Sequence, residues 1–171
     1  MCVNECKCEE ATVAIASSAT TSHKETGSHR PVLRVLKHDF VDMPAYQTDG
    51  AAGLDLRAYL VTGDVHVWPG ETKVVPTGIA VALPAGHEGQ VRGRSSMSRL
   101  GLVVVLGTVD EDYRGEIGVL VQNTSSSTIT LTHGQRIAQL VVAPVARCHV
   151  VVVDTLNDTV RGVGGWGSTG K

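Results

Sequence analysis

Short apolar runs dominated by valine, leucine and isoleucine recur between residues 31 and 153, and polar, glycine-containing stretches separate them. β-Branched residues pack well in sheets, while glycine and proline favour turns. The segment 128–132 alternates polar and apolar residues with the period of two expected of a half-buried strand. The pattern as a whole predicts strands at residues 32–36, 72–83, 102–106, 117–121, 128–132, 137–142 and 150–153.

Two features of this pattern predict a break within one strand and a turn between two others. Pro76 and Gly78 lie inside the 72–83 run and predict a break in that strand. Residues 110–116 are mostly polar and contain a glycine. They therefore predict a hairpin with a longer loop between the apolar runs on either side.

One segment has the character of a helix. In residues 95–101, Ser95 or Ser96 is a suitable N-cap and Gly101 a suitable terminator. Since the other predicted elements are short strands, the chain is predicted to be all-β, with a barrel or jelly-roll architecture.

The chain divides into three parts. Residues 1–30 are small and polar, lack apolar periodicity, and predict a flexible leader. Residues 31–154 contain the predicted strands. Residues 155–171 form a polar, glycine-rich tail that has no apolar core of its own.

The cysteines leave two interpretations open. Three of the four lie in the leader, where a histidine such as His23 or His29 would be needed to complete a zinc site. The interpretation we favour is free thiols in a reduced, intracellular protein. The four cysteines are Cys2, Cys6, Cys8 and Cys148.

Charge and hydropathy exclude some partners. A net charge of −2 and a pI near 6.4 argue against general binding to nucleic-acid polymers. No run approaches the roughly 18 apolar residues needed to span a bilayer, and the N-terminus lacks the pattern of a signal peptide. We therefore expect an intracellular protein, in the cytoplasm or nucleus, with no membrane partner.

Three segments carry candidate chemistry. In the tail, glycines, hydroxyls and Arg161 can bind an anion, and Trp166 can close over a flat partner; a disordered tail is the alternative. Asp110, in the polar turn, can act as a general base or simply be a solvated turn residue. Arg94 with the serines that follow it can bind phosphate, although such surface runs are common.

Five blocks of sequence, in order, resemble the five motifs of the trimeric dUTPase family. The resemblance extends from residue 31 to residue 171. The third and fifth blocks match especially closely. The blocks are 51–58 (AAGLDLRA), 94–97 (RSSM), 107–116 (GTVDEDYRGE), 134–140 (GQRIAQL) and 161–170 (RGVGGWGSTG).

The resemblance implies a distorted jelly-roll β-barrel that assembles as a homotrimer. Its active sites would lie between subunits, with the tail of one chain closing over a site built by the others. The reaction implied is hydrolysis of dUTP to dUMP and pyrophosphate, in which Asp110 activates the water that attacks the α-phosphorus. Mg²⁺ bound by the three phosphates would be the cofactor, and Asp55 would reach it through water.

The resemblance also assigns substrate contacts. Tyr113 would pack under the deoxyribose and leave no room for a 2′-hydroxyl, and Trp166 would stack on the base where the family usually has phenylalanine. The other expected contacts are Arg94, Ser95, Ser96 and Gln139 with the phosphates, Gly107 and Gly118 with uracil, and Arg161, Gly167, Ser168 and Thr169 in the closing tail.

Some positions differ from the family pattern. Ser96 stands where the family has glycine, Gln135 where it has aspartate, and Leu54 where it has an aromatic residue, and the segment 101–107 is short. These differences leave a second hypothesis open: the chain is a catalytically impaired member of the family with a regulatory or protein-binding role. A dCTP deaminase is disfavoured by the third and fifth blocks. This divergence around an intact catalytic set would suit a virus-encoded protein.

Overall fold

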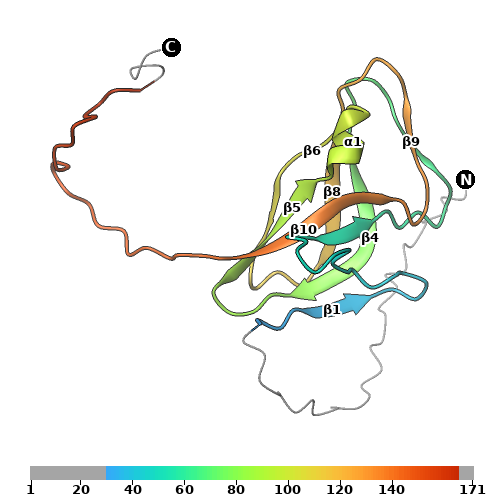
Figure 1. The fold of residues 1–171 in the computed structure, drawn as a ribbon, viewed down its shortest axis with the longest axis horizontal. Helices are drawn as coiled ribbons and strands as arrows, with labels where there is room; N and C mark the ends of the chain where they lie inside the picture. The colour runs from blue at the N-terminus through green and yellow to red at the C-terminus, as the bar shows by residue number, and fades with distance from the viewer. Residues whose placement is uncertain (1–29, 166–171) are drawn as a thin grey trace, which may run out of the picture. The chain divides into compact units, whose positions relative to one another are not determined.

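The computed structural model describes residues 30–165 of the chain, and the predicted leader lies almost entirely outside these residues. The described part consists almost wholly of strands and loops (Figure 1), which confirms the all-β prediction. Its elements are β1 (Arg34–Lys37), β2 (Leu54–Arg57), β3 (Val65–Val67), β4 (Thr72–Ala82), β5 (His87–Gly93), α1 (Ser95–Arg99), β6 (Leu102–Val104), β7 (Gly107–Val109), β8 (Glu116–Asn123), β9 (Ile129–Leu131) and β10 (Arg136–Pro144).

The strands form three antiparallel sheets. One sheet has the strand order β1-β4-β8-β6, and a second has the order β2-β10-β5-β7. The third is the pair β3-β9. Within residues 30–165 the hydrogen-bonded strands do not close into a single ring, so the barrel of the jelly-roll prediction is open here.

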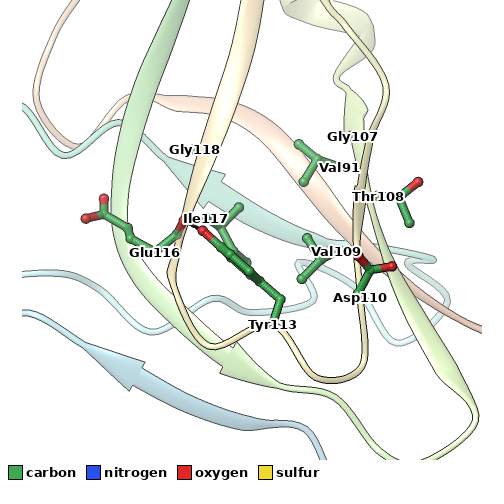
Figure 2. Close-up of a pocket in the computed structure, with 9 residues that line it drawn as sticks. All are labelled: Val91, Gly107, Thr108, Val109, Asp110, Tyr113, Glu116, Ile117 and Gly118. Atoms are coloured by element: carbon green, nitrogen blue, oxygen red, sulfur yellow. Dashed lines mark hydrogen bonds between the residues drawn. The ribbon is translucent and has the colours of Figure 1, made fainter.

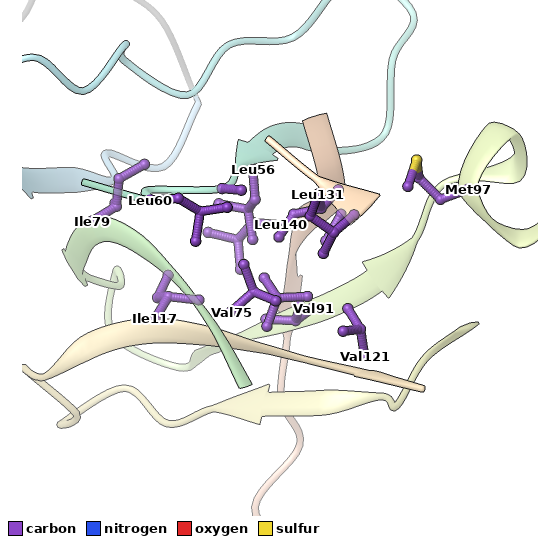
Figure 3. Packing of buried hydrophobic residues seen from close by; sticks show 14 of the residues in the cluster. Leu56, Leu60, Val75, Ile79, Val91, Met97, Ile117, Val121, Leu131 and Leu140 are labelled. Atoms are coloured by element: carbon purple, nitrogen blue, oxygen red, sulfur yellow. The ribbon is translucent and has the colours of Figure 1, made fainter. Parts of the chain in front are cut away.

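A single apolar core joins the two four-stranded sheets. Leu56 and Leu140 of the second sheet and Val75 and Val119 of the first have no exposed surface, and all four belong to one cluster (Figure 3). Along β8, buried residues alternate with more exposed ones, as expected when one face of a strand is covered. Burial of these aliphatic side chains is what fixes the two sheets against each other.

Most of the predicted strands are present. The runs at 32–36, 72–83, 102–106, 117–121, 128–132 and 137–142 correspond to β1, β4, β6, β8, β9 and β10. The prediction for 150–153 is wrong: these valines are exposed and form no strand, because no strand edge in the described part of the chain pairs with them. The strands β2, β3, β5 and β7 were not predicted.

The predicted hairpin differs from the structure in one respect. β6 and β8 pair antiparallel as expected, but β7 intervenes between them and pairs with β5 of the other sheet. The polar turn after β7 therefore crosses from one sheet to the other. This crossing separates β7 from β8 and creates space between them.

The predicted break in β4 is a large β-bulge. Pro76 lies opposite Gly118 and Ala80 opposite Glu116, so three residues of β4 face the single residue Ile117. Gly78 has a φ of +66°, a conformation that side-chain-bearing residues rarely adopt. The bulge bends β4 beside the beginning of β8.

The predicted helix is present as α1, but the predicted cap is wrong. The N-cap is Arg94, in extended conformation and without a side-chain capping bond, because the chain passes directly from β5 into the helix. Met97 is the buried residue of the helix, and Gly101 follows with a φ of +86°. Among residues 30–165, no helix is long and apolar enough to cross a membrane.

Candidate active site

A pocket of about 350 Å³ lies between β7 and β8, where the two sheets separate (Figure 2). We call it the β7–β8 pocket. Asp110 and Tyr113 line it from the turn, and Val91 of β5 lines it beside Gly107. Its size suits a small organic ligand. Four predicted site residues come together in it: Gly107, Asp110, Tyr113 and Gly118.

The ring of Tyr113 folds back across the turn. Its hydroxyl donates a hydrogen bond to the backbone carbonyl of Glu116 (3.1 Å). Gly115 makes this position possible, because a Cβ there would lie 2.6 Å from Cζ of the ring. About half of the Tyr113 surface stays exposed, so the ring presents an apolar face to anything bound in the pocket.

A second group of residues lies on β2, just after β5 and on β10, and we call it the arginine cluster. Asp55, Arg94 and Gln139 were predicted, and Arg136 joins them. Arg94 Nε contacts Asp55 Oδ1 at 3.0 Å, and Arg136 Nη1 contacts Asp55 Oδ2 at 3.1 Å. The Asp55 side chain is only 11% exposed, so this ion pairing is well shielded from water. Two cations held by one anion leave a net positive site suited to phosphate.

Gln139 is held beside this group by strand pairing. It lies opposite Asp55 on β2, so the two side chains share a face of the sheet. Its Nε2 donates to the Gly93 carbonyl (2.9 Å), immediately before Arg94. A Cβ at Gly53 would lie 2.7 Å from Gln139 Oε1, so this glycine leaves room for the amide.

The donor set suits a metal carried by the substrate rather than one held by the protein alone. Within residues 30–165 no three His, Cys, Asp or Glu side chains are grouped to hold an ion. Asp55 is the one carboxylate of the arginine cluster, and its oxygens keep free lone pairs for water. A single carboxylate beside a phosphate site fits Mg²⁺, which keeps several waters and binds substrate phosphates.

The β7–β8 pocket lies beside the middle of β5, and the arginine cluster lies at its end. Gly107 pairs with Val91 and Val109 with Gly89, whereas Arg94 follows the last residue of the strand. Three to five residues of strand correspond to about 10–17 Å along the backbone. The two groups also differ in direction: Val91 below the pocket faces the core, whereas Asp55 and Gln139 lie on the other face of the same sheet.

The remaining predicted residues are exposed or undescribed. Ser95 and Ser96 are exposed at the start of α1. Arg161 is exposed, and its Nε donates to the Gly164 carbonyl (2.8 Å) within the tail. The predicted tail contacts Trp166, Gly167, Ser168 and Thr169 lie outside the described residues.

Sequence reasoning missed several residues of these groups. Val91, Thr108, Glu116 and Ile117 also line the pocket, and Arg136 completes the arginine cluster. Glu116 and Arg136 belong to the third and fourth sequence blocks, so the blocks were a signal for both. The place of Val91 depends on the pairing of β5 with β7, which no local pattern reveals.

Comparison with known proteins shows which family the sequence is similar to. A family model described as dUTPase matches residues 39–170. The chain is 49% identical over 134 residues to a deoxyuridine 5′-triphosphate nucleotidohydrolase from Anaeromyxobacter, covering 77% of this chain and 89% of that protein. It is 43% identical over 155 residues to the protein of the same name from Rhizobium etli, covering 88% and 99%.

Solved structures give the same result at the level of the fold. A variant of the dUTPase of Staphylococcus bacteriophage 80alpha with dUpNHpp superposes with a TM-score of 0.71 at 25% identity, over 82% of this chain and 99% of that one. Another variant of the same phage enzyme has a TM-score of 0.72 at 26% identity, over 80% and 98%. The sequence blocks, the fold and these matches together establish that this chain belongs to the dUTPase family.

Proposed function

We propose that this chain hydrolyses dUTP to dUMP and pyrophosphate, with Asp110 as the general base. The observation that carries the proposal is the β7–β8 pocket, which brings Asp110 and Tyr113 to the edge of a cavity of nucleoside size. The curated relatives named deoxyuridine 5′-triphosphate nucleotidohydrolase, at up to 49% identity, support the same reaction.

Asp110 would accept the proton of a water molecule positioned at the α-phosphorus. The resulting nucleophile attacks, the bond to the bridging oxygen breaks, and pyrophosphate leaves. Asp110 is exposed at the start of the turn, where water reaches it. Such proton transfer contributes on the order of 10² to 10⁴ in rate.

The phosphates would be held by the arginine cluster and by the tail. Arg94 is fixed by Asp55 and by a bond from its Nη1 to the Arg136 carbonyl (3.1 Å), so it is oriented before substrate binds. Ser95, Ser96 and Gln139 would add neutral donors. Arg161, Gly167, Ser168 and Thr169 would complete the phosphate contacts when the tail closes. Preorganised charge is the main catalytic resource in phosphoryl transfer.

Mg²⁺ would be held by the substrate phosphates and, through water, by Asp55. When bound, it supplies neutralisation of the charge that develops on the phosphate oxygens.

Base and sugar would be recognised in the β7–β8 pocket. Backbone groups near Gly107 and Gly118 would pair with the uracil edge, which leaves cytosine mispaired in a dry site. Tyr113 would lie under the deoxyribose, and Trp166 from the tail would cover the base. Closure would exclude water and strengthen each polar contact.

The active site would be shared between the chains of a homotrimer. The two groups lie on different faces of the same sheet, about 10–17 Å apart along β5, which argues against one nucleotide touching both within one chain. A neighbouring subunit that brings its arginine cluster to this pocket removes the difficulty. The exposed run 150–153 is further surface that a partner chain can cover.

A second hypothesis is an impaired enzyme with a regulatory or protein-binding role, motivated by Ser96 and Gln135. Ser96 is exposed and its Oγ lies 3.5 Å from Arg94 Nη1, so its side chain faces solvent rather than crowding the backbone. Arg136 forms an ion pair with Asp55, so it does not need an aspartate at position 135, where this chain has glutamine. Both observations favour an active enzyme. Action inside a cell and viral origin stay predictions.

Turnover of dUTP beside dCTP, dTTP and UTP in the presence of Mg²⁺ tests the proposal. We expect pyrophosphate release from dUTP, and a loss of at least about 100-fold for Asp110→Asn with nucleotide binding retained. Absence of turnover in the folded, assembled protein would refute it. Ammonia release from dCTP would point to a deaminase, and a biological effect that survives Asp110→Asn would favour the regulatory hypothesis.

A further inference from the structure

The bulge in β4 leaves backbone donors that ordinary strand pairing does not satisfy. Three residues of β4 face only Ile117, so the partner strand offers too few carbonyls. The side chain of Glu116 replaces them: its Oε1 accepts hydrogen bonds from the backbone N–H groups of Thr77 (3.0 Å) and Gly78 (2.7 Å). The Thr77 hydroxyl donates to the Ile117 carbonyl (2.6 Å), which ties the strands at the next residue.

The backbone of the same glutamate holds the ring of Tyr113. The Glu116 carbonyl accepts the Tyr113 hydroxyl bond, while the Glu116 side chain points away from Asp110 and toward β4 (Figure 2). On its other side the ring lies over Gly115, where a Cβ would not fit. The position of the ring thus depends on a carbonyl whose own residue is fastened to the bulge.

We infer that Glu116 is a positioning residue that sets how strongly the β7–β8 pocket discriminates deoxyribose from ribose. The inference rests on the proposed function, in which the Tyr113 ring excludes the 2′-hydroxyl. The Tyr113 ring can exclude the 2′-hydroxyl of ribose by contact only if the ring cannot move aside. A shift of about 1 Å in the ring is enough to alter the selection between ribose and deoxyribose. Glu116 restrains the ring, because its carbonyl binds the Tyr113 hydroxyl while its side chain binds the β4 bulge.

The geometry assigns Glu116 no direct part in the chemistry. Its Oε1 is occupied by two backbone donors, and its Oε2 lies 4.0 Å from His38 Nε2, on the side of β1 and β4. Neither oxygen is directed at Asp110 (Figure 2). Its effect should therefore appear in selectivity between nucleotides more than in the rate with dUTP.

The test compares kcat/KM for dUTP and UTP in wild type, Glu116→Ala, Glu116→Gln and Tyr113→Phe, with Mg²⁺ and full-length protein. We expect Glu116→Ala and Tyr113→Phe each to lower the dUTP/UTP ratio roughly three- to tenfold, mainly by improving UTP. Glu116→Gln should retain most of the ratio, because its amide oxygen still accepts from both N–H groups. The double variant Glu116→Ala/Tyr113→Phe should lower the dUTP/UTP ratio by less than the product of the two single effects, because both substitutions act on the position of one ring.

Glu71→Ala is the matched control. Glu71 Oε2 also accepts a backbone N–H, from Trp68 (2.8 Å), but in the turn between β3 and β4. Removing it should leave the dUTP/UTP ratio unchanged. A fall in the ratio equal to that of Glu116→Ala would mean that the effect is general destabilisation and would overturn the inference.

An unchanged ratio in folded Glu116→Ala, or in Tyr113→Phe if the first variant does not fold, also overturns it. Thermal unfolding and size-exclusion chromatography establish folding and assembly for each variant. If wild type does not turn over dUTP, the proposed reaction is refuted. The role of Glu116 is then tested separately, by measuring the affinities for dUMP and UMP with calorimetry. A dUMP preference that is equal in wild type and Glu116→Ala then refutes the inference.

Discussion

Asp55 holds one arginine with each of its carboxylate oxygens. Its side chain is 11% exposed, whereas the Asp42 carboxylate, which pairs with Arg57 at 3.4 Å, is 75% exposed. Because Asp55 is shielded from water, removing its charge should destabilise the fold far more than removing the charge of Asp42. The loss of Asp55 leaves Arg94 and Arg136 close together without a counter-charge. An exposed pair contributes only about 0–1 kcal/mol.

We therefore expect Asp55→Asn to lower the free energy of unfolding by about 1–3 kcal/mol and kcat for dUTP by more than about tenfold. Asp42→Asn is the control, with a change below about 0.5 kcal/mol and kcat preserved. Thermal unfolding and steady-state kinetics measure both. Equal effects of the two substitutions would contradict the assignment of Asp55 to the phosphate site.

Glu71 predicts a pH dependence of stability. The hydrogen bond from the Trp68 backbone, and Lys73 beside it, hold the pKa of this carboxyl below its ordinary value of 4.5, outweighing desolvation. A lowered pKa in the folded state means that the ionised form stabilises the fold. That contribution is complete above the ordinary pKa and is lost as the pH falls through the folded-state pKa.

Glu71→Gln should therefore lower the melting temperature at neutral pH, whereas the difference from wild type should shrink as the pH falls below the ordinary pKa of 4.5 and through the lower folded-state pKa. Melting temperatures across a pH series check this. A difference that is constant over the whole series would show that loss of the charge is not responsible.

Single residues differed in how far the sequence revealed them. Asp110, Tyr113, Gly107 and Gly118 were predicted from one contiguous block and the strand after it, and the structure places all four in one pocket. Glu116 belongs to the same block, yet its bonds reach Thr77 and Gly78, 39 and 38 residues away. Its contacts follow from strand register, which local sequence does not determine.

At the scale of elements, the bulge in β4 shows which glycine is required. Gly78 has a φ of +66°, and a Cβ there would lie 2.6 Å from Val41 Cγ2 and 3.0 Å from Tyr59 Cγ. Gly70 has a similar φ of +77° but no atom within 4 Å of the same position. The first has both backbone and packing reasons to be glycine, and the second has only the backbone reason.

Gly78→Ala should lower the free energy of unfolding by about 2–4 kcal/mol, since strain and overlap add. Gly70→Ala should cost about 1 kcal/mol, the backbone part alone. Thermal or urea unfolding at one protein concentration compares them. If the two variants are equally destabilised, the packing around Gly78 is looser than described.

The strands that sequence predicted are those with continuous β-branched or aliphatic runs, such as β4, β8 and β10. β5 was missed because its sequence, HEGQVRG, is polar and has glycine where it packs closely. Gly89 is an example: a Cβ there would lie 3.0 Å from Leu140 Cδ1. β7, only GTV, is too short to show a period, and its pairing partner is the strand that was missed.

At the scale of the whole molecule, the pocket and the arginine cluster of one chain lie apart, which predicts complementation between defective subunits. In the proposed homotrimer, Asp110→Asn and Arg94→Ala chains should each assemble into inactive trimers. In mixed trimers, a site that combines Asp110 from one chain with Arg94 from another is intact. Random 1:1 mixing should restore roughly a quarter of wild-type activity over all trimers, and roughly a third in the mixed trimers alone.

Co-expression with two different affinity tags gives mixed trimers whose composition mass spectrometry confirms. The comparison is with each variant expressed alone and with the two purified homotrimers combined without subunit exchange. Mixed trimers that remain as inactive as the single variants would show that each site is built within one chain.

The placement of the β7–β8 pocket and the arginine cluster on different faces of one sheet has a consequence for enzyme behaviour in dilute solution. A chain that dissociates from the proposed trimer would keep both groups, yet they face different directions and would not hold one nucleotide together. Specific activity should then decline as enzyme concentration is lowered, even though every subunit remains folded. Added substrate should reverse that decline, since a nucleotide bridging two chains also draws them together.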